Sequence, residues 1–335
     1  MPDQPGRRDK NVAVALEISS GTSTIALVDK RGEIRYRCDA RTLWGRPAAA
    51  TLDPYLKAIE HALAYARDEG WRVRGLGVAL PGTLDETLRR PLSVAILPSL
   101  NAFPLSDALE ARYNLPARLC VDVDAAALAE YYLGEGKGCR KLLYLTLNAV
   151  MSSALLIDGV PVRSARSSIG HVAHLLVSNG GLRCSCGKRG CVNTFVSLEA
   201  LQRGVVRALR RGDETSITQR VQQGEQLSLR MLREESRLGD IVARQLYSEV
   251  ERWLTIASLC ALKLYEPDTL LLSGSMLAAG ESLVAGIRGA LNDSCGTIRI
   301  AMSQFGRDAA LIGATVPLFV KQPTNAMAET NTPIG

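Results

Sequence analysis

The sequence predicts an α/β protein of two lobes, each built on a mixed β-sheet. Each half of the chain begins with strands joined by short turns and then alternates helices with strands, a pattern typical of α/β folds. The chain has 335 residues, 47% of them hydrophobic, which is enough for two hydrophobic cores. Because the two halves are similar, we expect a cleft between the lobes, a usual place for a ligand.

The first lobe is expected over residues 11–122. Three strands open it, and the links SGTS and RG between them are short enough for tight turns. A helix follows, because Leu52, Leu56 and Ile59 recur at intervals of three or four residues. The expected elements are strands 11–19, 24–30 and 33–38, helix 51–69, strand 73–80, helix 104–114 and strand 117–121.

The second lobe is expected over residues 123–305. Its expected elements are helix 123–133, hairpin strands 141–147 and 152–159, helices 197–211, 227–237 and 239–265, a strand within 264–275, helix 279–291 and strand 297–303. A final helix at 306–321, within segment 306–322, is expected to pack back on the first lobe. We expect residues 1–10 to be flexible and residues 323–335 to be disordered.

Composition excludes some classes of protein. There is no apolar run of 18 or more residues, so we expect no membrane span. The N-terminal residues include basic ones but no apolar segment, so we expect no secretory signal and a cytoplasmic location. The net charge of +6 is spread along the chain; it permits an acidic partner without requiring one.

Three of the eight cysteines form a cluster. Cys184, Cys186 and Cys191 lie in the segment RCSCGKRGC, and in a cytosolic chain such a cluster indicates metal binding rather than disulfides. With His174 they would form a closed tetrahedral shell of three thiolates and one imidazole, which is typical of structural zinc. His171 is an alternative fourth ligand, and a third possibility is that neither histidine binds metal.

The segments GHVAH and CSCGKRGCVN together resemble the signature of the ROK (repressor, open reading frame, kinase) family. Its usual form is Gly-Glu-x-Gly-His, nine residues, then Cys-x-Cys-Gly-x-x-Gly-Cys-x-Glu, and this spacing selects His174 as the zinc histidine. Further landmarks follow in the family's order: ALPG at 79–82, VDVDAAALAE at 121–130, IDG at 157–159 and LLLSGS at 270–275. The resemblance covers about residues 11–322 and implies the two-lobed actin-like, sugar-kinase (ribonuclease H-like) fold with a zinc loop at 174–191.

The family includes ATP-dependent sugar kinases and sugar-responsive repressors, and it is commonly dimeric or tetrameric. The resemblance therefore implies a sugar or sugar derivative as ligand and a homodimer. The repressors carry an N-terminal winged helix-turn-helix. About ten residues precede the first expected strand here, so we expect no recognition helix and no direct DNA binding.

The resemblance also places the parts of a kinase site on particular residues. Asp122 takes the position of the general base, although its place before a helix also suits an N-cap. The residues that orient the sugar fall on Ser99, Asp122, His171, His174 and Asn193. Ser99 replaces an asparagine, whereas His171 and Asn193 replace glutamates. A carboxylate accepts hydrogen bonds from two sugar hydroxyls, and these replacements accept fewer or differently placed ones.

The phosphate-binding loops depart furthest from the family. The first loop, Asp-x-Gly-Gly-Thr in the family, is EISSG at 17–21, in which Glu17 keeps a carboxylate for magnesium. The second, Gly-Thr-Gly-Ile-Gly-x-Gly, is NAVMSSA at 148–154 and has lost every glycine, although glycine lets amides approach phosphate closely. The third, Gly-Gly, is Ser273-Gly274. The candidate nucleotide-binding residues are Glu17, Ser19, Ser20, Gly21 and Gly274, in loops whose changes argue against Mg-ATP as a cofactor.

The zinc ligands are therefore kept while the kinase parts are altered. This combination predicts a non-catalytic regulatory protein that senses a sugar or sugar derivative and acts on a separate protein partner. One alternative is an ATP-dependent sugar or amino-sugar kinase with Asp122 as base. The second is a repressor without the usual DNA-binding head, supported by the mild basic charge and the short segments RRDK at 7–10 and RALRRG at 207–212.

Overall fold

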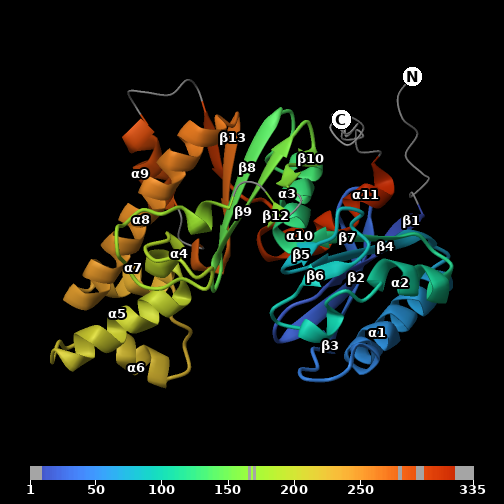
Figure 1. The fold of residues 1–335 in the computed structure, drawn as a ribbon, viewed down its shortest axis with the longest axis horizontal. Helices are drawn as coiled ribbons and strands as arrows, with labels where there is room; N and C mark the ends of the chain where they lie inside the picture. Colours follow the sequence, from blue (N-terminus) through green and yellow to red (C-terminus); the bar gives the residue numbers. More distant parts are fainter. Residues whose placement is uncertain (1–9, 165–166, 169–170, 278–280, 292–297, 321–335) are drawn as a thin grey trace, which may run out of the picture. The chain divides into compact units, whose positions relative to one another are not determined.

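The computed structural model describes residues 10–164, 167–168, 171–277, 281–291 and 298–320. The chain divides into two compact units, and each has its own five-stranded sheet and hydrophobic core (Figure 1). Unit 1 comprises Met1–Leu133, Arg163–Ser167 and Asp308–Gly335, and unit 2 comprises Gly134–Val162 and Ser168–Arg307. Both sheets combine parallel and antiparallel strands, so the predicted mixed α/β class is confirmed.

The sheet of unit 1 begins as an antiparallel meander and continues with parallel strands. In spatial order its strands are β3 (Ile34–Arg41), β2 (Thr22–Asp29), β1 (Asn11–Glu17), β4 (Arg72–Leu80) and β7 (Ala117–Val121). Alternate residues of β1 such as Val14 and Leu16 are buried in one core with Tyr55 and Ile59 of helix α1 (Ala48–Asp68). Helix α2 (Leu105–Tyr113) contributes Leu109 to the same core.

Small residues let helices approach the unit 1 sheet and each other closely. A Cβ added to Gly77 of β4 would overlap the backbone carbonyl of Ala314. Helix α3 (Asp122–Leu133) and helix α10 (Ala309–Gly313) meet in the same way, since a Cβ on Gly313 would overlap the carbonyl oxygen of Ala125. These contacts explain why α3 groups with unit 1, whereas residues 123–133 were expected in the second lobe.

The end of the described chain differs from the single helix expected at 306–321. A 3-10 turn, η4 (Gly306–Asp308), leads into α10, and a separate short helix α11 (Val316–Phe319) follows. Pro317 has no N–H to donate to the carbonyl of Gly313, which interrupts the helix between the two pieces. Both pieces belong to unit 1. Residues 1–9 and 323–335, expected to be flexible and disordered, lie outside the described residues.

The sheet of unit 2 is built on a hairpin to which two parallel strands are added. In spatial order its strands are β10 (Val160–Pro161), β9 (Met151–Ile157), β8 (Lys141–Leu147), β13 (Thr269–Ser273) and β14 (Arg299–Met302). The 25-residue helix α8 (Ile241–Tyr265) packs Leu254 and Leu262 into this core. Among the described residues, no helix is both long enough and apolar enough to cross a membrane.

The remaining elements of both units are short or line the unit 2 core. They are β5 (Thr83–Leu84), β6 (Pro91–Ser93), η1 (Pro98–Leu100), β11 (Arg163–Ser164), β12 (Ser167–Ser168), η2 (Val172–His174), α4 (Asn193–Val196), α5 (Leu198–Arg210), α6 (Ile217–Gln222), α7 (Leu229–Arg237), η3 (Ser275–Leu277) and α9 (Glu281–Leu291). The two-residue strands and helices α4 and α6 carry no periodic apolar pattern long enough to predict them.

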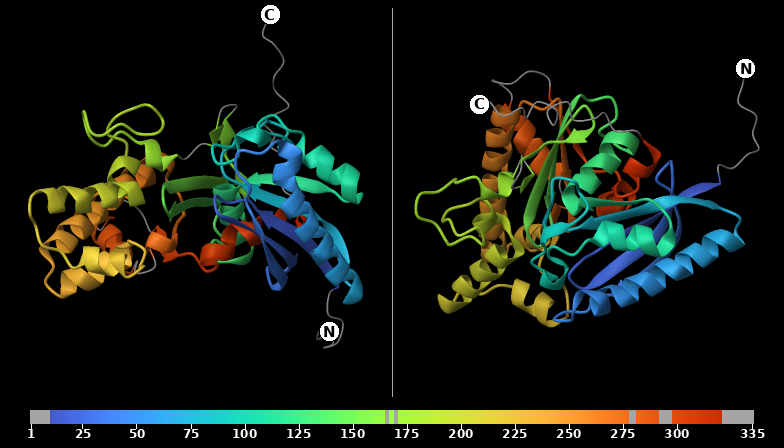
Figure 2. Two further views of the ribbon diagram at one scale, coloured as in Figure 1. Left: turned by 90° about the horizontal axis from the view of Figure 1, so that it is seen from below. Right: turned by 45° about the vertical axis from the view of Figure 1, so that its right-hand side comes forward.

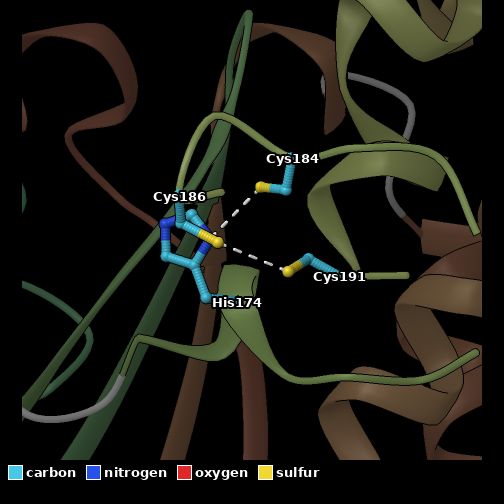
Figure 3. Close-up of side chains that lie close together, drawn as sticks. All are labelled: His174, Cys184, Cys186 and Cys191. Atoms are coloured by element: carbon cyan, nitrogen blue, oxygen red, sulfur yellow. Dashed lines mark hydrogen bonds between the residues drawn. The ribbon is translucent and has the colours of Figure 1, made fainter. Parts of the chain in front are cut away.

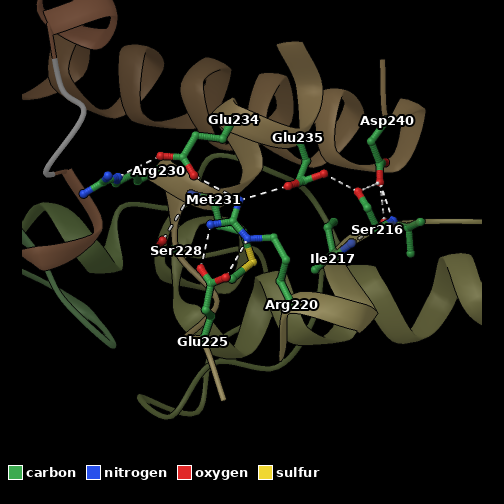
Figure 4. A network of polar contacts seen from close by, with 11 residues as sticks. Ser216, Ile217, Arg220, Glu225, Ser228, Arg230, Met231, Glu234, Glu235 and Asp240 are labelled. Atoms are coloured by element: carbon green, nitrogen blue, oxygen red, sulfur yellow. Dashed lines mark hydrogen bonds and ion pairs between the residues drawn. The ribbon is translucent and has the colours of Figure 1, made fainter. Parts of the chain in front are cut away.

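Helix α6 buries one apolar side chain, Ile217, in the core of unit 2, and polar side chains hold the rest of the helix (Figure 4). Arg220 of α6 pairs with Glu225 at 2.6 Å and with Glu234 and Glu235 of α7, each at 2.9 Å. At the other end of α6, the carboxylate of Asp240 accepts a hydrogen bond of 2.8 Å from the backbone N–H of Ser216. The charge of Arg220 is thus neutralised by neighbouring carboxylates, which join α6 to α7. We therefore assign this cluster a structural role.

Candidate functional site

Four residues in unit 2 lie close enough together to hold a metal ion. His174 ends η2, and the three cysteines follow on the loop that leads to α4; the group is His174, Cys184, Cys186 and Cys191 (Figure 3). Their ligand atoms all lie within 4.8 Å of one another. The Nδ1 atom of His174 is 3.5 Å from the sulfur of Cys184, and the sulfurs of Cys186 and Cys191 are 3.6 Å apart.

These distances fit a zinc ion. With Zn–S bonds of about 2.3 Å, the edge of a tetrahedral site is about 3.8 Å. Four protein ligands close the coordination shell, so the arrangement suits a structural ion with no open position for water. The ring of His171 is centred 6.2 Å from that of His174, and His171 is not a member of the group.

The surroundings of the thiols also favour a cation. A backbone hydrogen bond from Lys188 lowers the pKa of the Cys186 thiol, which favours the thiolate that binds metal. Burial and the neighbouring thiols raise the pKa of Cys191 to about 12, so a cation is needed for all three sulfurs to be ionised together. Burial also lowers the pKa of His174, which keeps its imidazole in the neutral form that coordinates metal.

In unit 1, two predicted site residues lie at one edge of the sheet. Strands β1, β4 and β7 run parallel, and the pairings of Glu17 with Ala79 and of Leu80 with Val121 bring their carboxyl ends together. Glu17 ends β1, and Asp122 follows directly on β7 as the first residue of α3. The sheet topology therefore places both carboxyl groups at the same edge.

Burial changes the acidity of both groups. It raises the pKa of Glu17 to about 7; the charges of Asp122 and Asp308 act in the same direction, and Arg37 opposes them. Burial also raises the pKa of Asp122, although the carboxylate accepts a 2.7 Å hydrogen bond from the N–H of Val123. A buried carboxyl with a raised pKa can act as a general base or acid, and this bond at the start of α3 also agrees with a capping role.

Asp124, two residues further along α3, forms an ion pair that the sequence did not suggest. Its side chain is only 1% exposed, and its carboxylate lies 2.9 Å from Nε of Arg163, which is 23% exposed. The pairing neutralises a buried carboxylate beside Asp122. Arg163 lies 39 residues from Asp124, and no local pattern connects the two.

The first loop, residues 17–21, is held by hydrogen bonds within unit 1. The N–H of Ser19 donates to the hydroxyl of Ser23 at 3.2 Å, and the carbonyl of Ser19 accepts from the hydroxyl of Thr42 at 2.9 Å. The carbonyl of Gly21 accepts from the N–H of Thr42, while Ser20 is exposed. Beneath the loop, the buried hydroxyls of Ser23, Thr42 and Tyr55 bond to one another.

The second loop, residues 148–154, uses its polar groups inside unit 2. The N–H of Met151 donates to Oδ1 of Asn193 at 3.0 Å, and the hydroxyl of Ser153 accepts from the N–H of Val172 at 2.9 Å. Val150 does not take a positive φ, and its side chain is 53% exposed. The loop is therefore a tight hairpin connection between β8 and β9, and the side chain of Asn193 closes it.

The second and third loops are tied together. Oδ1 of Asn148 accepts hydrogen bonds from the backbone N–H of Ser275 at 2.9 Å and from its hydroxyl at 3.2 Å. Gly274 has a φ of 111°, and a Cβ there would overlap the backbone of Leu147. Close packing of β8 and β13 is thus sufficient to explain this glycine.

Ser99, the remaining predicted sugar residue, lies in η1 of unit 1. Its hydroxyl is 3.2 Å from that of Thr51 on α1. The structure thus gathers the four candidate metal ligands within unit 2 and the two candidate carboxyl groups within unit 1. Sequence reasoning missed Arg37, Arg163 and Asp308, whose contacts join segments far apart in the chain.

Comparison with known proteins agrees with the fold. The profile of the ROK family matches residues 13–321, and the chain belongs to this family. The glucokinase of Halalkalibacterium halodurans is 22% identical over 324 residues, covering 95% of this chain and 97% of that protein.

Solved structures include both kinases and regulators of the same family. A ROK family glucokinase from Streptomyces griseus, solved with glucose and AMPPNP, has a TM-score of 0.72 and 25% identity, covering 90% of this chain and 97% of its own. A ROK family transcriptional regulator, a homolog of the Escherichia coli MLC protein, has a TM-score of 0.80 and 20% identity, covering 92% and 78%. The predicted sugar-kinase fold is therefore confirmed, and the relatives include both sugar kinases and repressors.

Proposed function

We propose that this chain is a non-catalytic regulatory member of the ROK family that senses a sugar or sugar derivative. The observation that carries the proposal is the hydrogen bond from the N–H of Met151 to the side chain of Asn193. Amides of a phosphate-binding loop must be free to point at the ligand. Here the amide of Met151 instead donates to Asn193 within the protein. By resemblance to the family, Asn193 takes the place of a sugar-binding glutamate.

The hydrogen bonds that Ser275 donates to Oδ1 of Asn148 support the same conclusion, because they join two loops that would both have to admit nucleotide. Glycine is absent from residues 148–154, so this loop cannot adopt the open backbone of a phosphate cradle without strain. We therefore propose that Mg-ATP is not a cofactor of this protein and that zinc, held by His174 and the three clustered cysteines, has a structural role.

A sugar ligand is supported by the relatives, among them the glucokinase solved with glucose. We propose that Ser99, Asp122, His171, His174 and Asn193 contribute to its binding, as the family signature implies. The replaced carboxylates favour a derivative whose hydroxyl groups differ from those of glucose. A homodimer that signals to a separate regulatory protein remains part of this proposal, as does a cytoplasmic location.

The second candidate is an ATP-dependent sugar or amino-sugar kinase. Glu17 and Asp122 favour it, because both lie at one edge of the sheet and burial raises the pKa of both. In a kinase, Glu17 would be the carboxylate near magnesium and Asp122 the general base. The glucokinases among the relatives support it equally.

An ADP-release assay across a panel of hexoses, amino sugars and their N-acetyl derivatives distinguishes the two candidates. The regulatory proposal expects the zinc-loaded wild type to release ADP no faster than the Asp122→Asn variant with every sugar. Turnover of one sugar by the wild type that Asp122→Asn abolishes would establish the kinase instead. The Streptomyces griseus glucokinase with glucose serves as the positive control.

A further inference from the structure

The zinc-binding segment forms a ribbon, residues 175–191, that extends from the helices of unit 2 (Figure 2). Gly190 pairs with two other parts of the ribbon: its carbonyl accepts a hydrogen bond of 3.0 Å from the N–H of Val177, and its N–H donates to the carbonyl of Leu182 at 3.1 Å. The N–H of Cys184 donates to the carbonyl of Lys188 at 2.8 Å. Metal binding by the cysteines would fix this small framework.

Two large apolar side chains on the ribbon are in contact with water. Leu176 is 59% exposed and Leu182 is 43% exposed. They flank the stretch around Gly190, because Leu176 lies opposite Cys191 while Leu182 bonds to Gly190 from the other side. A single exposed leucine needs no explanation, but two on one small projecting element indicate a contact surface.

The same ribbon carries cations that pair with no carboxylate among the described residues. Arg183, Lys188 and Arg189 are all exposed, and no ion pair joins them to a carboxylate among the residues that the structure describes. The sequence has no Asp or Glu at all from residue 159 to residue 198. Arg183 and Arg189 lie directly opposite each other in an antiparallel bridge, where like charges repel. A carboxylate from outside would relieve this repulsion.

We propose that the ribbon is a docking surface for an acidic and apolar segment of another protein. Carboxylates of the partner would pair with Arg183, Lys188 and Arg189, and its apolar side chains would cover Leu176 and Leu182. The inference does not depend on the proposed function, because such a surface would serve a kinase as well as a regulator.

A protein partner fits this surface better than a nucleic acid does. Three cations neutralise few phosphates, which gives weak binding at physiological salt concentration. Proteins that bind single strands add aromatic side chains on which bases stack, and the ribbon has none. Exposed leucines contribute nothing to binding a phosphate backbone, whereas they contribute to a protein interface.

The test is selection of random 12-residue peptides displayed on phage against the zinc-loaded full-length chain. The docking surface is expected to enrich peptides that combine Asp or Glu with Leu, Ile or Phe. A synthetic copy of an enriched peptide should then lose affinity by at least about tenfold in Arg183→Ser/Arg189→Ser and in Leu176→Ser/Leu182→Ser. Its affinity should also fall as salt concentration rises.

Controls separate the surface from the fold and from general charge. The zinc content of each variant is measured, and Arg183→Lys/Arg189→Lys, which keeps the charges, should retain most of the affinity. Arg207→Ser/Arg210→Ser removes two exposed arginines of α5 outside the ribbon and should leave affinity unchanged. Enriched peptides without acidic residues, or equal binding by the ribbon variants and the wild type, would overturn the proposal. Duplex DNA that binds through the ribbon and displaces the peptide would overturn it in favour of nucleic acid.

Discussion

At the scale of single residues, the most informative groups are two carboxyls in unit 1. Glu17 and Asp122 lie at the carboxyl ends of β1 and β7, and burial raises the pKa of both. For Glu17 the raised pKa of about 7 means that the folded protein binds a proton more tightly than the unfolded chain does. The contribution of this group to stability is therefore complete below its unfolded value of 4.5 and is lost as pH rises through about 7.

Glu17→Gln should accordingly raise the melting temperature at pH 8 and change it little at pH 5. The glutamine carries no charge, so it removes the cost of an ionised buried group near Asp122 and Asp308. Thermal unfolding of both proteins from pH 5 to pH 8 measures the effect. Glu86→Gln, which changes an exposed glutamate in the same unit, should give no such pH dependence. An equal shift at both pH values would show that Glu17 is already ionised at pH 5.

The buried ion pair beside Asp122 makes a second residue-scale prediction. Arg163→Ala leaves the carboxylate of Asp124 buried without its cation and should lower the free energy of unfolding by up to about 3 kcal/mol. Asp124→Asn in the same chain should restore part of that loss, since it removes the charge. Arg112→Ala breaks an exposed pair with Glu60 in the same unit and should lower the free energy of unfolding much less, because solvent screens the pair. Equal losses in the two arginine variants, measured by urea unfolding, would contradict the account.

At the scale of elements, close helix packing should be sensitive to one methyl group. Gly313→Ala places a Cβ against the carbonyl of Ala125 where α10 crosses α3, and overpacking of this kind costs roughly 1–3 kcal/mol. Gly286→Ala in α9 has open space around its Cβ and should be neutral or stabilising by up to about 1 kcal/mol. Thermal unfolding compares the two. A Gly313→Ala variant as stable as the wild type would mean that α10 moves freely.

The ribbon should depend on its metal. We expect one zinc ion per chain, and we expect its removal by a chelator to speed hydrogen exchange at the amides of Val177 and Gly190. Cys184→Ser should reduce zinc content, whereas Cys260→Ser, at an exposed cysteine outside the group, should not. Unchanged exchange after complete zinc removal would show that the ribbon folds without metal.

Periodic elements were predictable from the sequence, and elements fixed by distant contacts were not. The short apolar run in β1 and the three- and four-residue spacing in α1 identified both correctly. Helix α6 was missed because Arg220 and Asp240 hold it through side chains rather than through an apolar stripe. The final helix was predicted as one piece because Pro317 was not weighed as an interruption.

The same distinction holds for the candidate site. The spacing of cysteines and His174 is local, so the sequence identified the group that the structure brings together. The ion pair of Arg163 with Asp124 joins residues that are 39 positions apart, and nothing in either neighbourhood pointed to it. The glycine replacements in the second loop could be seen in the sequence. The hydrogen bond by which Asn193 closes that loop could be seen only in the structure.

At the scale of the whole molecule, the chain combines a ROK fold with altered loops. The chain belongs to the ROK family over residues 13–321. Its relatives include glucokinases and repressors, so the two functions to compare are sugar kinase and regulator. The hydrogen bonds of Met151 and Asn148 favour a regulator, whereas the raised pKa values of Glu17 and Asp122 favour a kinase. Binding of nucleotide is the property in which the two functions differ most.

The most direct test is a thermal-shift measurement on zinc-loaded protein with Mg-ATP alone, with a panel of sugars and sugar phosphates alone, and with both together. A ligand at about 100 times its Kd stabilises the native state by about 2.7 kcal/mol, which raises the melting temperature measurably. The account predicts that one or more sugar derivatives raise the melting temperature and that Mg-ATP does not. A rise with Mg-ATP, larger when a sugar is present, would contradict it and would assign the chain to the sugar kinases.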